Sequence, residues 1–215
     1  MKKIFIVGGG GFARECHLAL TGLEKSDPSI SFGGFLGHNG HEVDAGTYSH
    51  LCLGDVSAHE FKEDEYAVIG VGNVAIRKKI FFDLKNAGIK LFTLICGSSL
   101  SPTVKYGEGN AFFGATITSE VVIGDGNLFN GDIIVGHDCR FGNFNFIAPR
   151  TTFLGYVSVG SENLIGTGSV LLPGCKIGDG NKIAPLSAVY KGCRSNCYMM
   201  GNPAMKVGDI QNGEL

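Results

Sequence analysis

The sequence predicts an α/β domain, half of a Rossmann-like fold, over residues 1–97, followed by an all-β parallel β-helix over residues 98–215. Two observations predict this order. Apolar runs alternate with helical patterns in the first half, and hydrophobic residues recur at every sixth position in the second. A chain of 215 residues, 44% of them hydrophobic, is long enough to give each domain its own core.

Strands and helices alternate in the first half of the chain. Continuous apolar runs, typical of strands buried on both faces, predict strands over residues 3–8, 31–36, 66–72 and 89–95. Helices are expected over residues 11–23 and 73–88, the second with Asn73 as its N-cap and Gly88 as its stop. One side of the first helix carries Ala13, Cys16, Ala19 and Leu20. This alternation is typical of a parallel sheet.

A glycine loop joins the first strand to the first helix. Gly8, Gly10 and Ala13 fit the pattern G-x-G-x-x-A, in which glycines let a phosphate approach the backbone. The free N–H groups of the following helix attract the same anion. We therefore expect the loop, with Gly11 and Phe12, to contact a phosphorylated ligand; a simple tight turn is the alternative.

The end of the second predicted strand argues against NAD. A dinucleotide site needs a carboxylate there to hold the ribose, but the chain has Gly37, His38 and Asn39. Another phosphorylated ligand, such as a nucleotide-sugar, stays open.

The second half has a period of six. From Ile123 to Arg194 the chain divides into twelve hexads, and every first position is Ile, Val, Leu or Phe. At a hydrophobic frequency of 44%, twelve in a row has a chance of roughly 0.00005. Each hexad is expected to form a short strand and a turn, and three hexads one triangular coil of 18 residues. Residues 123–194 would then form four coils, preceded by an imperfect coil that begins near residue 99.

His137 is the only histidine after His59, and Asp138 follows it directly. His137 holds the third place of its hexad, and an imidazole inside so narrow a prism would have no partner. We therefore expect it at a corner that faces outward. A neutral imidazole, with an ordinary pKa of about 6.5, can accept a proton at pH 7. Asp138 could accept the other ring N–H if a turn brings the two side chains together; a surface histidine and a solvated aspartate are the alternatives.

The cysteines are not expected to be catalytic or to bind metal. Cys139, Cys175 and Cys193 hold fifth hexad positions, where small side chains pack. Cys193 and Cys197 lack the further ligands of a zinc site. Seven cysteines without an export signal favour reduced thiols in a cytoplasm. A net charge of −2 without a basic stripe argues against nucleic acid, and no apolar run is long enough to insert into a membrane.

The hexads resemble the left-handed parallel β-helix acyltransferases, and the left hand is implied by that resemblance alone. The first half narrows the match. A glycine loop, "VIGVGNVAIRKKI", "VGHDC" and a closing "GNPAMKV" resemble the bacterial sugar acetyltransferases, which include the nucleotide-amino-sugar N-acetyltransferases and the sialic-acid O-acetyltransferase group. The resemblance implies acetyl-CoA as donor, a nucleotide-sugar in the first domain, and a homotrimer with active sites between adjacent prisms.

The resemblance also implies roles for particular residues. His137 would be the general base and Asp138 its partner, and the backbone N–H of Gly155 would stabilise the oxyanion. Acetyl-CoA would be contacted by Asn130, Gly155, Asn202, Pro203 and Ala204. The nucleotide-sugar would be contacted by Gly8, Gly10, Gly11, Phe12 and Asn73. The chain departs from the family at Phe12 and Phe146, where the family often has histidine, and at Gly37 and His38, where it often has an acidic pair.

Three functions therefore compete. The first is acetyl transfer to the amino group of a nucleotide-linked 4-amino-4,6-dideoxy sugar in bacterial surface-glycan synthesis, and the second is O-acetylation of a sugar hydroxyl. The third is a non-catalytic scaffold or a metal trimer of the carbonic-anhydrase kind, which would need more histidines than the prism has. The sugar and its nucleotide, UDP, dTDP or GDP, are left open.

Overall fold

The computed structural model describes residues 1–39, 43 and 45–211. The chain forms two compact units. The first holds Met1–Gly72 and Ile76–Cys96, and the second holds Asn73–Ala75 and the chain from Gly97 onward.

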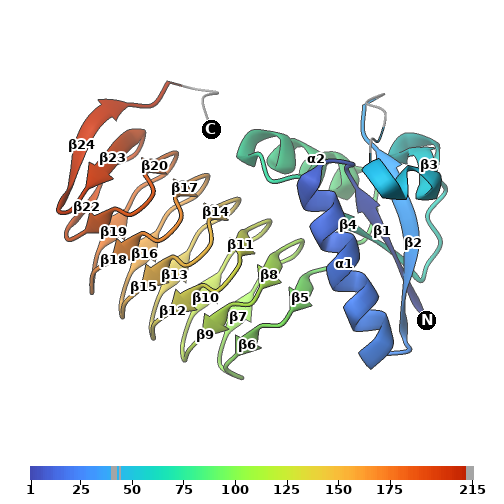
Figure 1. The fold of residues 1–215 in the computed structure, drawn as a ribbon, viewed down its shortest axis with the longest axis horizontal. Coiled ribbons are helices and arrows are strands. Elements are labelled where there is room, and N and C mark those ends of the chain that lie inside the picture. The colour runs from blue at the N-terminus through green and yellow to red at the C-terminus, as the bar shows by residue number, and fades with distance from the viewer. Residues whose placement is uncertain (40–42, 44, 212–215) are drawn as a thin grey trace. The chain divides into compact units, whose positions relative to one another are not determined.

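The first unit is built on a four-stranded parallel sheet of order β3-β2-β1-β4 (Figure 1). Its strands are β1 (Lys2–Val7), β2 (Ile30–Gly37), β3 (Cys52–Asp55) and β4 (Glu65–Ile69). The helices of this part of the chain are α1 (Gly11–Ser26) and α2 (Val74–Asn86), with 3-10 turns η1 (Gly46–Leu51) and η2 (Val56–Ala58). The predicted parallel sheet is confirmed; β3 was missed because its four residues carry too short an apolar pattern.

Both predicted helices are present. The residues that α1 buries are the four expected ones, Ala13, Cys16, Ala19 and Leu20. α2 ends at Asn86, and Gly88, two residues further on, has a φ of +73° that few other residues adopt easily. The Gly88 N–H donates to Lys85 O (3.0 Å) and the Ile89 N–H to Leu84 O (2.9 Å), which is a Schellman C-cap.

The prediction of a strand over residues 89–95 was wrong for most of its length. Leu91 makes one isolated parallel bridge to Ala67, and the chain then leaves that sheet. Regular strand structure resumes only at β5 (Leu94–Cys96). A run of apolar residues predicts that a segment packs against the core, but it does not show how many hydrogen bonds the backbone makes to a neighbouring strand. The sequence therefore could not reveal that the chain leaves the sheet after Leu91.

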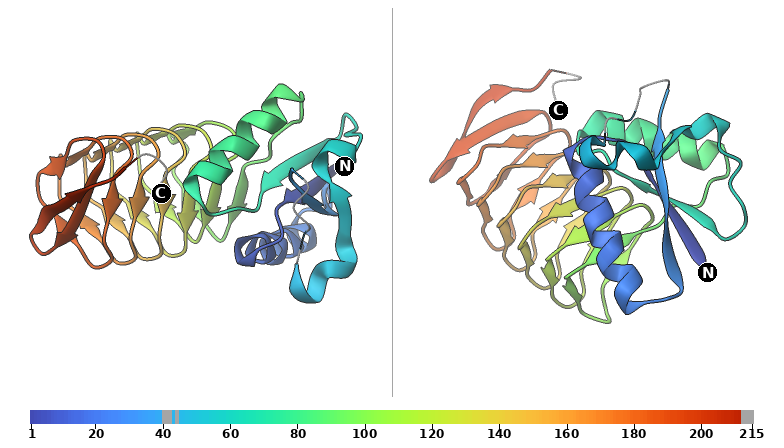
Figure 2. Two further views of the ribbon diagram at one scale, coloured as in Figure 1. Left: turned by 90° about the horizontal axis from the view of Figure 1, so that it is seen from above. Right: turned by 45° about the vertical axis from the view of Figure 1, so that its right-hand side comes forward.

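The second unit is a parallel β-helix with three faces, stacked coil upon coil (Figures 1 and 2). Face 1 consists of β6 (Ser99–Leu100), β9 (Thr116–Ile117), β12 (Ile134–Val135), β15 (Thr152–Phe153), β18 (Val170–Leu171) and β21 (Ala188–Val189). Face 2 consists of β7 (Lys105–Tyr106), β10 (Val122–Ile123), β13 (Arg140–Phe141), β16 (Ser158–Val159), β19 (Lys176–Ile177) and β22 (Gly192–Cys193). Face 3 consists of β8 (Ala111–Phe113), β11 (Leu128–Asn130), β14 (Phe146–Ile147), β17 (Leu164–Ile165), β20 (Lys182–Ile183), β23 (Cys197–Gly201) and β24 (Ala204–Asp209), and β5 continues the same sheet beyond β8.

The hexads fill the interior as predicted. All twelve first-position side chains are buried, with at most 4% of their surface exposed. Strands pair with the strand 18 residues further on, as Val122 does with Arg140. The first coil is one residue shorter, so that Leu100 pairs with Ile117. The prism therefore begins near residue 99, as expected.

The last hexad departs from the prediction of four uninterrupted coils. Lys176 pairs with Gly192, only sixteen residues on, where the repeat would place residue 194. Gly192 makes the shorter path possible, since a Cβ added to it would lie 1.8 Å from Lys176 O. After this coil, β23 and β24 form an antiparallel hairpin.

The corners of the first eleven hexads share a positive φ at the fourth residue, between +49° at Asp132 and +72° at Gly174. In the shortened last hexad the fourth residue, Gly192, also has a positive φ of +89° but already belongs to β22. Such a φ is typical of the third residue of a type II turn. Side chains at the third hexad position therefore leave the corner in similar directions.

Candidate active site

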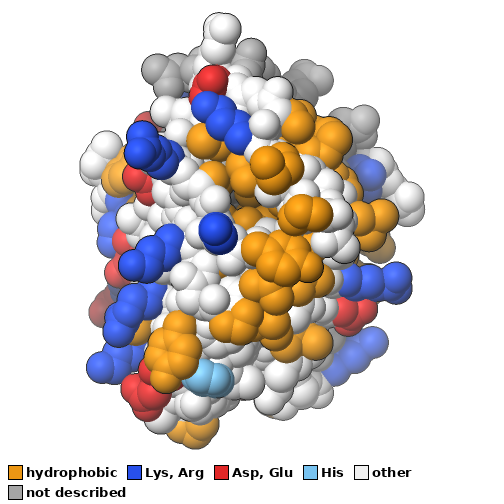
Figure 3. Space-filling model, turned by 90° about the vertical axis from the view of Figure 1, so that its left-hand side faces the viewer, with side chains coloured by type: hydrophobic (Ala, Val, Ile, Leu, Met, Phe, Trp, Pro, Cys, Tyr) orange, Lys and Arg blue, Asp and Glu red, His pale blue; other side chains and the backbone are white. Residues whose placement is uncertain are grey.

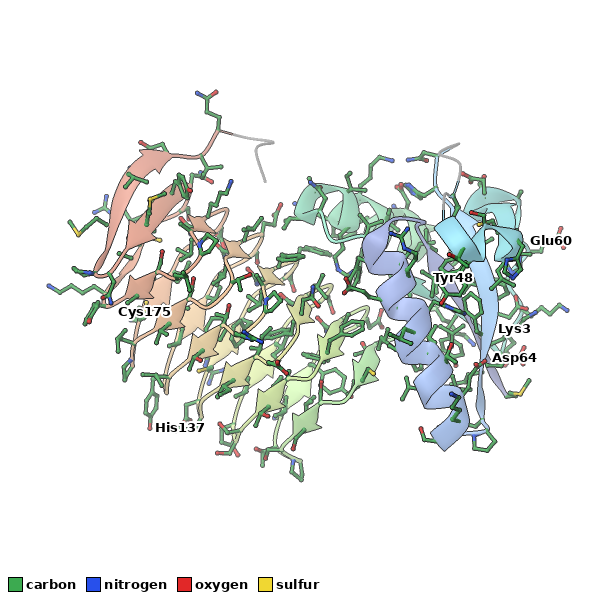
Figure 4. The ribbon with its side chains drawn as sticks, viewed as in Figure 1. Lys3, Tyr48, Glu60, Asp64, His137 and Cys175 are labelled. Atoms are coloured by element: carbon green, nitrogen blue, oxygen red, sulfur yellow. The ribbon has the colours of Figure 1, made fainter. Side chains whose placement is uncertain are left out.

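His137 lies at a corner of the β-helix between face 1 and face 2. β12 ends at Val135, His137 and Asp138 form the turn, and β13 begins at Arg140. The His137 side chain is 54% exposed and points away from the coils (Figure 4). The expectation of an outward-facing corner is confirmed.

The turn brings the two neighbouring side chains together. The φ of Asp138 is +59°, and its backbone N–H donates to Ser119 O (3.0 Å). In this conformation Asp138 Oδ2 lies 2.9 Å from His137 Nδ1. An ionised Asp138 carboxylate can only accept hydrogen bonds, so this contact favours the tautomer of the neutral ring in which Nδ1 carries the proton. Nε2 is then the basic nitrogen.

Gly155, one coil further along, lies against the imidazole. A Cβ added to Gly155 would come within 2.7 Å of both Cε1 and Nε2 of His137. Any larger residue at position 155 would displace the ring. Gly155 and His137 therefore share one corner, eighteen residues apart, as the repeat predicts.

Tyr156 restrains His137 from the side and was not predicted as a site residue. The two rings meet edge to face, with centroids 5.1 Å apart and an interplanar angle of 89°. The Tyr156 N–H also donates to His137 O (3.0 Å). The repeat could have predicted this contact, because Tyr156 comes nineteen residues after His137, which is one coil of eighteen residues plus one position.

Asn130 lies at a different corner. It ends β11 on face 3, before the chain turns to face 1, and it is half-buried. His137 lies after the next strand, at the corner of faces 1 and 2. Within one chain, the structure does not bring Asn130 into the same corner as His137.

The predicted "GNPA" residues belong to the C-terminal hairpin. Asn202 and Pro203 join β23 to β24 and are exposed, and Ala204 begins β24. A cavity of about 430 Å³ lies between this hairpin and the last coil, and Pro203 and Ala204 line it. Lys191 and Lys206 also line it, so cationic and apolar groups meet in one groove. Figure 3 views this end of the β-helix and shows hydrophobic side chains gathered on it, with lysines and arginines nearby.

The glycine loop follows β1 in the first unit, and its glycines have different roles. Gly8 has a φ of +127°, and a Cβ on it would lie 2.9 Å from Gly70 O, so packing alone requires glycine there. Gly10 has an ordinary φ of −78°, and a Cβ on it would meet no atom within 4 Å. Gly10 is the N-cap of α1 without a side-chain cap, Gly11 begins the helix, and Phe12 is half-buried in its first turn.

Two arginines that the sequence analysis did not select lie near this loop. The Arg14 guanidinium lies between Gly11 and Gly46, with Nη2 and Nη1 respectively 3.9 and 3.7 Å from a Cβ added to each. A cation near the N-terminus of a helix is unfavourable to the helix dipole, so Arg14 adds positive charge to an end that is already partly positive. The buried Arg77 donates from Nη1 to Ile69 O (2.7 Å) and Val71 O (3.3 Å). It thereby fixes the segment beside Gly8, and Asn73 follows this segment, exposed, directly before α2.

The cysteines are poorly suited to nucleophilic catalysis. Burial raises the pKa of the Cys139 thiol, whose Sγ donates to Leu154 O (3.1 Å). Burial likewise raises the pKa of Cys175 to about 11 and of Cys193 to about 12. None of the seven cysteines, all of which lie among the described residues, forms a disulfide. Among residues 1–39, 43 and 45–211, no cluster of His, Cys, Asp and Glu could hold a metal ion.

Comparison with solved structures identifies the fold. The acetyltransferase domain of PglB from Neisseria gonorrhoeae, in complex with acetyl coenzyme A, aligns with a TM-score of 0.86 at 23% identity, over 96% of this chain and 99% of its own. PerB from Caulobacter crescentus, in complex with CoA and GDP-perosamine, aligns with a TM-score of 0.84 at 25% identity, over 97% and 98%. WeeI from Acinetobacter baumannii aligns with a TM-score of 0.82 at 21% identity, over 96% and 100%.

The chain thus has the fold of the sugar N-acetyltransferases of known structure, an α/β domain followed by a left-handed parallel β-helix. Its residues 3–84 match the PglD N-terminal domain family. Within the described chain, no helix is both long and apolar enough to cross a membrane.

Proposed function

We propose that this protein transfers the acetyl group of acetyl-CoA to the amino group of a nucleotide-linked 4-amino-4,6-dideoxy sugar in bacterial surface-glycan synthesis. The observation that carries the proposal is the corner at which His137, Asp138 and Gly155 meet. It holds a basic imidazole nitrogen beside a backbone amide, the two groups that acyl transfer to an amine needs.

The reaction follows from this corner. As the amine attacks the thioester carbonyl, His137 Nε2 accepts the proton of the amine. The Asp138 carboxylate, 2.9 Å from Nδ1, stabilises the imidazolium that forms. The Gly155 N–H donates to the oxyanion of the tetrahedral intermediate. When the intermediate collapses, the CoA thiolate leaves and takes the proton from Nε2.

The donor is proposed to lie along the β-helix toward the C-terminal hairpin. The cavity of about 430 Å³ beside Pro203 and Ala204 offers an apolar wall for the pantetheine arm. Lys191 and Lys206 at the same cavity match the phosphates of CoA. Asn130 and Asn202 remain proposed donor contacts, Asn130 from another corner and hence from an adjacent chain.

The acceptor nucleotide is proposed to bind in the first unit, at the glycine loop. The uncapped N-terminus of α1 and the Arg14 guanidinium favour a pyrophosphate there. Gly10, Gly11, Phe12 and Asn73 are the proposed contacts, whereas the structure explains Gly8 by packing. PerB binds GDP-perosamine, which supports a nucleotide-linked amino sugar as acceptor.

Two further parts of the proposal concern assembly and location. A homotrimer would complete each active site with an adjacent prism, because one face of a prism cannot enclose both a CoA arm and a sugar. The reaction is proposed to occur in the cytoplasm, where thiols stay reduced, since the seven cysteines form no disulfide among the described residues.

The first test is replacement of the base. His137→Ala and His137→Asn should keep the fold and the affinity for acetyl-CoA but lower kcat by about 100-fold or more, because the amine loses its proton acceptor. Asp138→Asn should cost less. Thr167→Ala, an exposed third-position side chain at another corner, is the control and should keep wild-type kcat. Thiol release with a panel of amino-sugar nucleotides measures turnover, and near-wild-type kcat in His137→Ala would show that the base is misassigned.

O-acetylation of a sugar hydroxyl is the second candidate, since His137 could deprotonate a hydroxyl by the same chemistry. The product decides between the two. An amide survives hydroxylamine and an ester does not, so mass spectrometry of the treated product identifies the acceptor atom.

A further inference from the structure

The corner between faces 2 and 3 shows how this β-helix caps its exposed amides. At this corner, the residue at the third hexad position donates its backbone N–H to a side-chain oxygen. That oxygen belongs to the third-position residue of the next coil. Asp125 N donates to Asn143 Oδ1 (2.7 Å), and Asn143 N donates to Ser161 Oγ (3.0 Å). Ser161 N donates to Asp179 Oδ1 (2.6 Å), and Asp179 N to Ser195 Oγ (2.9 Å).

The same position at the catalytic corner carries no such side chain. The residue one coil beyond Gly155 is Pro173, which has no hydrogen-bonding group in its side chain. Accordingly, in the part of the chain that the structure describes, no acceptor bonds the Gly155 N–H. Gly155 O, by contrast, is bonded by Gly174 N (3.0 Å).

The two corners have the same positive φ at the fourth hexad position. The residues that follow the capped pair Asn143 and Ser161 have φ values of +56° and +60°. Those that follow Gly155 and Pro173 have φ values of +62° and +72°. A short polar side chain at position 173 would therefore be directed at the Gly155 N–H, as Ser161 is at Asn143.

We propose that Pro173 is a positioning residue that keeps the Gly155 amide uncapped and available to the oxyanion. This rests on the proposed function, in which that amide stabilises the tetrahedral intermediate. Proline suits the task because its fixed φ is the one that the second residue of a type II turn requires. The corner thus forms without a polar side chain that would compete with the substrate for the amide.

The test introduces a side-chain oxygen at position 173 that can accept a hydrogen bond from the Gly155 N–H. Pro173→Asn and Pro173→Ser should lower kcat at least tenfold, toward the roughly 100-fold effect of losing one oxyanion donor. KM for acetyl-CoA and the melting temperature should change little, because residue 173 is exposed. Hydrogen exchange of the Gly155 amide should slow in both variants, which reports the cap without any assay of activity.

Two control variants separate capping from other effects. Pro173→Ala removes the ring without adding an acceptor, so kcat and Gly155 exchange should stay within about twofold of wild type. Pro185→Asn places the same cap at the corner of faces 3 and 1, opposite Thr167 N, and should leave kcat unchanged.

The outcomes are decisive. A slowed Gly155 amide with unchanged kcat, unchanged exchange in both capping variants, or an equal loss of kcat in Pro173→Ala would each overturn the proposal. Failure of the proposed function shows separately, as unchanged turnover in His137→Ala, which does not depend on position 173.

Discussion

At the scale of single residues, the imidazole of His137 is restrained on three sides although half of its surface is open. Asp138 bonds Nδ1, Gly155 supports the ring from the next coil, and Tyr156 contacts it edge to face. Restraint of this kind keeps Nε2 aimed in one direction before substrate binds, which removes reorganisation from the reaction. An unrestrained surface histidine would sample several rotamers.

Gly10 allows a sharp residue-scale prediction about the acceptor site. Its φ is ordinary and the space around its Cα is empty, so Gly10→Val should leave the melting temperature nearly unchanged. If a pyrophosphate lies against the loop, the valine side chain should raise KM for the nucleotide-sugar at least tenfold and leave KM for acetyl-CoA as it is. Steady-state kinetics with each substrate varied in turn measures both.

The control for Gly10→Val is the same substitution on the same helix. Gly22 of α1 is equally open, and Gly22→Val should leave both KM values unchanged. A parallel rise of both KM values in Gly10→Val, together with a large drop in melting temperature, would assign the glycine to the fold alone.

At the scale of elements, buried asparagines tie the coils of the β-helix together. Asn127, Asn145, Asn163 and Asn181 hold fifth hexad positions eighteen residues apart, and all are at most 1% exposed. Each carboxamide oxygen from Asn127 to Asn163 accepts from the backbone N–H and the side-chain amide of the next asparagine, at 2.8 to 3.0 Å. The ladder satisfies polar groups that would otherwise be buried without partners.

Removal of one rung should destabilise the whole prism. Asn163→Ala leaves both the backbone N–H and the side-chain amide of Asn181 without their acceptor. The free energy of unfolding should fall by about 2 to 6 kcal/mol, since each of the two buried groups left without a partner costs about 1 to 3 kcal/mol. Urea denaturation at fixed protein concentration measures the change. The exposed Asn143→Ala should cost less than about 1 kcal/mol, and an equal loss in the two variants would contradict the role of burial.

At the scale of the whole molecule, face 1 is suited to self-association. Its outward-facing side chains are uncharged: Ser99, Thr116, Ile134, Thr152, Val170 and Ala188. Face 2 instead presents Lys105, Arg140 and Lys176 at the equivalent places. An uncharged, partly apolar face is what an interface between copies of one chain requires.

We therefore expect light scattering at micromolar concentration to give three times the 22.7 kDa of one chain. Ile134→Arg should weaken the trimer and lower turnover together, because a charge would be buried at the interface; Ile134 is 52% exposed in the single chain. Val122→Arg, on face 2, is the matched control and should keep both. A wild-type protein that is monomeric at this concentration would refute the assembly.

The sequence by itself determined what depends on period and local chemistry. The hexads predicted twelve buried first positions. The glycine loop predicted where α1 begins, and Gly88 predicted where α2 stops. These features could be predicted because each follows from the spacing of apolar residues or from a backbone conformation that few residues adopt.

Only the tertiary structure decided which side chains eighteen positions apart are in contact, and how those contacts orient the groups at the corner of His137. It placed the His137 ring on Gly155, closed the contact with Asp138 through a positive φ, and left the Gly155 amide opposite a proline. It also shows one isolated bridge at Leu91 where a strand was expected over 89–95, and it places Asn130 at another corner. The physical reason is that a repeat specifies register along the prism, whereas the direction of a side chain or an N–H at a corner depends on the coils stacked above and below it.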